Sequence, residues 1–104
     1  MSSGARAALL ARYLKAARQR VADQREYPYV ARRARLEGTV CLRVSIAAAG
    51  NVLNVTPTCG DAQLPLLRAA IASVSKAAPF PPLPAALGPQ LTFEVPVVFQ
   101  LDAM

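Results

Sequence analysis

The chain has 104 residues, of which 54% are hydrophobic and 17% charged, so it is long enough for one folded domain and too short for two. It has no histidine and two cysteines, which excludes the usual general base, Ser/His and Cys/His nucleophile pairs and zinc fingers. We therefore expect no enzyme activity, no catalytic residue, no metal site and no cofactor, and no apolar run reaches the roughly 18 residues of a membrane span.

The amino-terminal part is predicted to form one long helix and one short helix. Residues 1–5 lack the charged and apolar regions of a secretory signal and read as the trimmed end of an expressed fragment. Residues 6–24 have a helical period, and their apolar positions form one stripe: Leu10, Leu14, Ala17 and Val21. Tyr27-Pro28 ends this helix, and a short helix is predicted from Tyr29 to Arg35.

The net charge of +6 is concentrated near the start of the chain, because nine of the twelve Lys and Arg residues lie in the first 35. A basic arm of this kind fits nucleic acid, an anionic membrane or wall polymer, or an ordinary solvated helix face. Nucleic-acid readers usually interleave stacking aromatics, and the only aromatics nearby are Tyr13, Tyr27 and Tyr29. The solvated face is therefore favoured, and a basic nucleic-acid-binding module remains an alternative.

The central part of the chain is predicted to form a β-hairpin. Thr39–Ala47 and Val52–Thr58 both alternate with a period of two, and Gly50 lies in the turn between them. The inward positions are Val40, Leu42, Val44 and Ile46 on the first strand and Leu53 and Val55 on the second. Pairing Val44 with Val55 keeps both inward faces together, which specifies the register.

A second long helix, an extended connector and a third strand complete the chain. The helix is predicted over Leu64–Ala78, with an inward stripe of Leu67, Ile71 and Val74. Residues 79–84 are proline-rich; their PxxP spacing would suit an SH3-like groove, but a rigid connector is the more common role. Leu91–Leu101 then alternates, with inward positions Leu91, Phe93, Val95, Val97, Phe99 and Leu101.

These elements predict a single α+β domain over 1–104, with its core in 27–101. Its sheet is antiparallel and three-stranded, with helices on one face. Proline is confined mainly to sheet edges, so Pro57 and Pro96 place the second and third strands outside and give the order 2-1-3. An extended partner peptide could add to the third strand if its rim of N–H and C=O groups is open; alternatively, Glu94 and Pro96 only blunt this edge.

Four motifs resemble the carboxy-terminal domain of TonB-type energy transducers. The stretch Tyr27–Val40 (YPYVARRARLEGTV) is similar to the opening of that domain, and Leu42–Val52 is similar to its first hairpin. Pro79–Pro82 (PFPP) and Val95–Phe99 (VPVVF) resemble its later loop and last strand. The resemblance covers about 20–101, and the middle of the chain also resembles the third domain of TolA, so a TolA-like envelope-spanning interaction domain is an alternative.

The TonB resemblance implies a periplasmic domain of an inner-membrane-anchored protein in a Gram-negative bacterium. Domains of this family capture the TonB box of outer-membrane transporters as an added strand and transmit work derived from the proton-motive force, without chemistry of their own. The implied partners are a transporter peptide and, through an amino-terminal part, the inner-membrane motor proteins; no nucleic acid is expected. A homodimer is compatible with this interpretation, and so is a contact with peptidoglycan or another anionic polymer through Arg18, Arg20, Arg32 and Arg33.

The resemblance also implies where the partner peptide would lie. The family's box-contacting glutamine falls on Gln24, close to Tyr27. The remaining predicted contacts lie on the last strand: Thr92, Glu94, Val95, Val97, Val98 and Phe99. Pro96 lacks an N–H, so the partner strand must tolerate one missing donor.

The two cysteines are predicted to pair only if the hairpin is irregular. In the periplasm implied by the resemblance, Cys41 and Cys59 would ordinarily form a disulfide. However, a register with Ile46 opposite Leu53 places Cys59 opposite Val40, and Cys41 then points to the other face. A bond needs a bulge or bend, so the paired and the free state both remain open.

Overall fold

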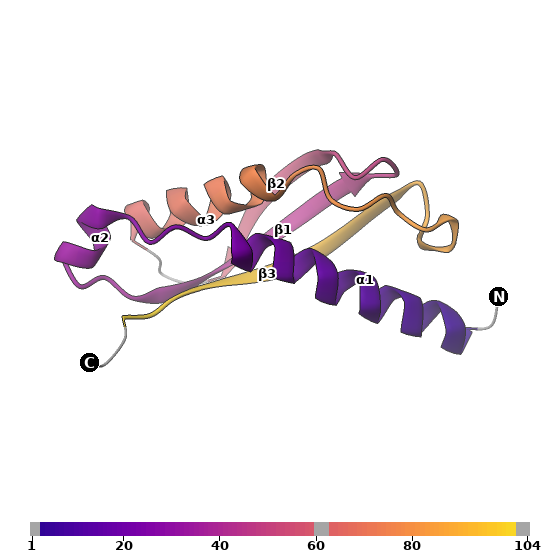
Figure 1. The fold of residues 1–104 in the computed structure, drawn as a ribbon, viewed down its shortest axis with the longest axis horizontal. Helices are drawn as coiled ribbons and strands as arrows, with labels where there is room; N and C mark the ends of the chain where they lie inside the picture. Colours follow the sequence, from indigo (N-terminus) through magenta and orange to yellow (C-terminus); the bar gives the residue numbers. More distant parts are fainter. Residues whose placement is uncertain (1–2, 60–62, 102–104) are drawn as a thin grey trace.

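A computed structural model describes residues 3–59 and 63–101. The elements are α1 (Ser3–Asp23), α2 (Tyr29–Arg33), β1 (Gly38–Ala47), β2 (Val52–Cys59), α3 (Leu64–Ala77), the 3-10 turn η1 (Ala85–Leu87) and β3 (Gln90–Phe99). The sheet is antiparallel, and the two long helices lie on one of its faces (Figure 1). Of the five residues predicted to be a fragment end, residues 1–2 lie outside the described residues, and residues 3–5 form the first turn of α1.

The strand order β2-β1-β3 confirms the order predicted from the prolines. Pro57 lies in β2 and Pro96 in β3, and both strands are edges of the sheet. The central strand contributes four fully buried side chains to the core, as its alternation predicts: Val40, Leu42, Val44 and Ile46. The strand without proline can donate to both neighbours, which is why it occupies the centre.

The hairpin register differs from the prediction at its turn end. Val44 does pair with Val55, but a register shift beyond Ser45 pairs Ile46 with Val52 instead of Leu53. Leu53 is consequently 48% exposed, so the prediction that it belongs to the core is wrong. The extra residue of this bulge changes the face of the β2 side chains between the bulge and the turn.

A second register shift settles the state of the cysteines. It lies between Cys41 and Leu42 and places Cys41 directly opposite Cys59. Their Cα atoms are 5.0 Å apart, and the two residues form a disulfide. The irregularity that a bond required is therefore present, and it joins β1 to the end of β2.

The face of α3 that packs on the sheet is rotated slightly from the predicted face. Val74 is buried as expected, whereas Leu67 and Ile71 lie half-buried at the margin of the core. The buried line is Leu66, Ala70, Ser73, Val74 and Ala77. Its small residues allow the helix to approach the sheet closely, and the Ser73 hydroxyl is satisfied because it donates to the Ala69 carbonyl at 2.9 Å.

α1 covers the β3 side of the same face, and its amino-terminal half extends beyond the sheet (Figure 1). Ala17 and Val21 are fully buried, while Leu10 and Leu14 are only partly so. Tyr13, which the predicted stripe omits, is 7% exposed. Its hydroxyl donates to the Pro81 carbonyl at 2.6 Å, and burial raises the pKa of this phenol above its usual range.

The proline-rich connector of residues 79–84 is hydrogen-bonded to the hairpin turn and packed into the core. The N–H of Phe80 donates to the Gly50 carbonyl, and the N–H of Leu83 donates to the Ala48 carbonyl, both at 2.9 Å. The Phe80 ring is buried and meets Phe93 of β3 edge to face, with centroids 6.0 Å apart. The connector thus ties the hairpin turn to β3.

Candidate functional site

The side chains of β3 alternate between the core and the solvent. Val95, Val97 and Phe99 are 1%, 3% and 1% exposed, so these three predicted partner contacts offer no side chain to another molecule. Their burial follows from the same alternation that predicted the strand. Thr92, Glu94 and Val98 lie on the exposed face, and of the six predicted contacts on this strand only they present side chains to solvent.

The backbone of β3 alternates in the same way between its neighbour and the outer rim. The Nε of Arg18 donates to the Glu94 carbonyl at 3.0 Å, and Nη1 of Arg25 donates to the Val98 carbonyl. Both donors come from outside the sheet, so these carbonyls face away from β1. In an antiparallel ladder alternate residues point to opposite sides, which places the backbone groups of Thr92, Glu94, Pro96 and Val98 on the rim.

Pro96 therefore lacks an N–H on the rim and not on the side of β1. Its position opposite Cys41 costs the sheet no ladder bond, which explains why proline is tolerated there. The rim itself is not fully open, because two of its carbonyls accept bonds from arginine side chains. The expectation of an unobstructed rim is wrong for the carbonyls of Glu94 and Val98.

Two cross-strand contacts fix the exposed side chains of β3 on the face away from the helices. Ser45 Oγ and Thr92 Oγ1 are 2.9 Å apart, and Nη2 of Arg43 lies 3.5 Å from Oε1 of Glu94. This ion pair is more than half exposed and contributes little to stability. It does compensate the Glu94 charge, so the rim presents backbone groups without an uncompensated carboxylate.

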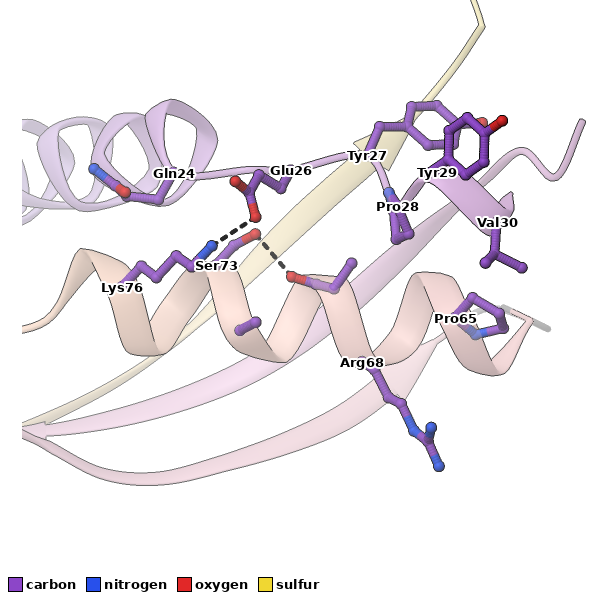
Figure 2. A pocket seen from close by; sticks show the side chains of 12 residues that line it. Gln24, Glu26, Tyr27, Pro28, Tyr29, Val30, Pro65, Arg68, Ser73 and Lys76 are labelled. Carbon is purple, nitrogen blue, oxygen red and sulfur yellow. Dashed lines mark hydrogen bonds and ion pairs between the residues drawn. The ribbon is translucent and has the colours of Figure 1, made fainter. Parts of the chain in front are cut away.

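Gln24 and Tyr27, the other predicted contacts, line a separate groove (Figure 2). One wall of this groove is formed by α2 and by residues 24–28, the linker between α1 and α2, and the other wall is the outer face of α3. Its volume is about 680 Å³, and none of the lining residues belongs to β3. The Tyr27 ring meets Phe99 edge to face at 5.5 Å, and its hydroxyl donates to the Leu36 carbonyl. Tyr27 thus connects the groove with the inner face of β3, while Gln24 lines the groove.

The groove has an apolar end and a charged end. Tyr29 and Val30 are 71% and 67% exposed at the first, near Pro65. At the other, Nζ of Lys76 lies 2.7 Å from Oε2 of Glu26, and Figure 2 shows this pair bridging from α3 to the linker. The hydrogen bond and charge of Lys76 hold the pKa of Glu26 below its usual range.

We predict that replacing Lys76 by alanine raises the pKa of Glu26 toward its ordinary value. The bridge stabilises the fold above the ordinary pKa of glutamate, and this contribution is lost as the pH falls through the lowered value of the folded state. NMR titration of the Glu26 side-chain carbon would measure the shift. Arg68→Ala is the matched control, because Arg68 lines the groove without contacting Glu26; an equal shift in both variants would contradict the assignment.

The early arginines are used within the domain to a degree that the sequence did not reveal. Four of them donate to main-chain carbonyls: Arg6 to Ala86, Arg18 to Glu94, Arg20 to Ala77 and Pro79, and Arg25 to Val98. Arg20 thereby caps the last residue of α3, where a cation is favoured by the helix dipole. The basic segment is thus not only a solvated face, because several of its arginines hydrogen-bond to main-chain carbonyls of the domain.

Neither a metal-binding cluster nor a membrane-spanning helix is found among the described residues. No group of three or more His, Cys, Asp or Glu residues within 3–59 and 63–101 lies close enough to hold a metal ion. In the same part of the chain, no helix combines the length and the apolar character that crossing a bilayer requires. The rim of β3 and the groove of Figure 2 remain as the candidate binding surfaces.

Comparison with known proteins identifies related domains. The sequence model for the C-terminal region of the Gram-negative bacterial TonB protein matches residues 23–101. Two NMR solution structures of the Helicobacter pylori TonB C-terminal domain resemble the fold. The longer fragment has a TM-score of 0.77 and 22% identity, with 89% of this chain and 84% of that chain covered. The shorter has a TM-score of 0.65 and 21% identity, with 85% and 92% covered. Comparison with curated protein sequences gives no significant match.

Proposed function

The chain belongs to the family of Gram-negative TonB C-terminal domains, and we propose that it binds the TonB box of outer-membrane transporters by strand addition to the outer rim of β3. Domains of this family are periplasmic, non-enzymatic interaction domains of inner-membrane-anchored proteins that serve energy transduction and transport. In this proposal the domain holds the transporter peptide while work derived from the proton-motive force is transmitted through the rest of the protein.

The outward backbone of β3 is the observation that supports this proposal. Thr92, Glu94 and Val98 each direct an N–H and a C=O toward the rim, and Pro96 directs a C=O only. A guest strand can therefore form several main-chain bonds, each contributing about 1 kcal/mol net. That sum fits a transient complex, and it requires a guest whose register leaves one carbonyl unbonded opposite Pro96.

Gln24 and Tyr27 have a secondary role in this proposal. They line the groove beside α3, and in this proposal they contact the transporter outside the added strand. The alternatives have less support: the family match extends over most of the chain and favours a TonB-type over a TolA-type domain. A nucleic-acid-binding role has less support because Arg6, Arg18, Arg20 and Arg25 already donate to carbonyls of the domain.

The decisive experiment is an NMR titration with peptides from the plug ends of outer-membrane transporters. We expect the amides of Thr92, Glu94 and Val98 to shift and to become protected from hydrogen exchange, while amides that face β1 change little. Val98→Pro removes one rim N–H and should weaken binding about fivefold, since one hydrogen bond is lost. Val98→Ala keeps that N–H and is the control. Shifts confined to Tyr29, Val30 and Arg68 would place the peptide in the groove and contradict strand addition.

A further inference from the structure

Two arginine side chains, one from the carboxy-terminal half of α1 and one from the residues that follow it, reach the rim carbonyls that a guest strand would have to bond. Arg18 and Arg25 donate to the carbonyls of Glu94 and Val98, which are two of the acceptors that a guest needs. We propose that these two arginines form a latch, which closes the rim of β3 in the free domain and must open before a peptide can add. This inference rests on the proposed function and concerns the control of that same site.

The spacing of the two arginines matches the spacing of the rim carbonyls. Arg18 and Arg25 are seven residues apart, and the residues that carry the carbonyls are four apart. Seven helical residues rise about 10 Å, and four strand residues rise about 13 Å. α1 ends at Asp23, and the N–H groups of Gln24 and Arg25 continue it as a tighter turn by bonding to the carbonyls of Val21 and Ala22. Such a turn rises about 2 Å per residue, which brings the two spans closer together, and the long arginine side chains can bridge the remaining difference. One continuous segment can therefore cover both carbonyls at once.

The segment approaches the rim through side chains and leaves space on either side of Arg18. One hollow of about 380 Å³ lies between the leucines of α1 and the start of β3, and Arg18 and Glu94 line it. A second hollow of about 570 Å³ lies between α1 and Pro96, and Arg18 lines it as well. Arg18 thus borders both hollows beside the rim, and release of its side chain would leave more space there for a guest.

Opening this latch does not require α1 to leave the domain. Ala17 and Val21 are fully buried, the Tyr13 hydroxyl is bonded to Pro81, and Arg20 is bonded to Ala77. The contacts of Arg18 and Arg25, by contrast, are exposed to solvent. The latch can therefore open by movement of two side chains and the short linker, and guest affinity is reduced by the fraction of time for which it stays closed.

The test compares Arg18→Ala/Arg25→Ala with Arg12→Ala/Arg33→Ala, which removes the same charge from nearby positions that do not contact the rim. The probe is the plug-end peptide of the titration above, and affinity is measured by calorimetry. We expect the first variant to bind about tenfold more tightly than the wild-type domain and the control to bind like it, since two exposed bonds no longer compete. Each single alanine variant should show about a threefold gain, and these variants serve if the double variant folds poorly.

The outcomes separate the latch from the proposed function. Tighter binding by Arg18→Ala/Arg25→Ala, or binding by this variant alone, supports the latch. Equal binding by this variant and the control overturns the latch and leaves strand addition intact. Weaker binding also overturns it, because the arginines would then hold the guest and not exclude it. If no variant and no wild-type domain binds any plug-end peptide, strand addition fails, and the latch fails with it.

Discussion

Replacing Gly50 by alanine is expected to destabilise the domain by about 3–5 kcal/mol, because the new side chain would meet both strain and a fixed obstacle. Gly50 has a φ of +96°, a region that L side chains rarely adopt. A Cβ built there would lie 1.9 Å from the carbonyl oxygen of Phe80 and 2.8 Å from its carbon. Both are backbone atoms, so no side-chain rotation can relieve the contact.

The Phe80 carbonyl belongs to the contact between the hairpin turn and the proline-rich connector, which explains why the loss of stability should be large. The Phe80 N–H donates to the Gly50 carbonyl, and the Phe80 ring packs on Phe93 of β3. Moving the connector away would therefore cost a main-chain bond and a buried aromatic contact together. The effect should reach β3 as well as the turn.

Alanine variants of two other glycines separate the cost of backbone strain from the cost of the steric clash. Gly88 has a φ of +106°, but its added Cβ would come no closer than 3.0 Å to a backbone atom, so alanine there should cost about 1–2 kcal/mol. At Gly38 the nearest atom is a leucine methyl at 3.9 Å, and alanine should change stability by less than about 0.5 kcal/mol. Urea unfolding of the three variants would measure the order, and an equal midpoint for Gly50→Ala and Gly38→Ala would contradict the argument.

The architecture of this domain could be predicted because its signals are local and redundant. Alternation fixed the inward face of β1, and the two prolines assigned the edges through the loss of a backbone donor. The errors at Leu53 and in the stripe of α3 have a different origin. A bulge or a small rotation of a helix changes which residues face inward without changing the pattern, and it is decided by packing that the sequence does not display.

The position of the candidate site could also be predicted from local signals, but the prediction missed the side chains that contact it. An edge strand follows from the topology, so the rim of β3 could be anticipated from Pro96 and the strand order. The carbonyl contacts of Arg18 and Arg25 could not, because long flexible side chains have no periodic signature and their partners are more than seventy residues away. Likewise, only the structure shows that Gln24 belongs to the groove beside α3.

Removing the disulfide with Cys41→Ser/Cys59→Ser is expected to lower the free energy of unfolding by about 3 kcal/mol. The two cysteines are separated by 18 residues in sequence, and a bond that closes a loop of this length restricts the unfolded chain by about that amount. A loss of this size is a large part of the stability of a small domain. Urea unfolding with and without reductant would measure it, and the serine variant should not respond to reductant.

The position of the disulfide also predicts what its loss should leave unchanged. Cys41 lies on the central strand, opposite Cys59 on one side and opposite Pro96 on the other. The bond thus secures the end of β2. The rim lies on the side of β3 that faces away from β1, and the hydrogen-bond ladder between β1 and β3 remains without the disulfide. The serine variant should therefore bind plug-end peptides as the wild-type domain does at temperatures well below its lowered midpoint. Weaker peptide binding by the fully folded serine variant would show instead that the Cys41–Cys59 disulfide is needed to hold β3 in its peptide-binding form.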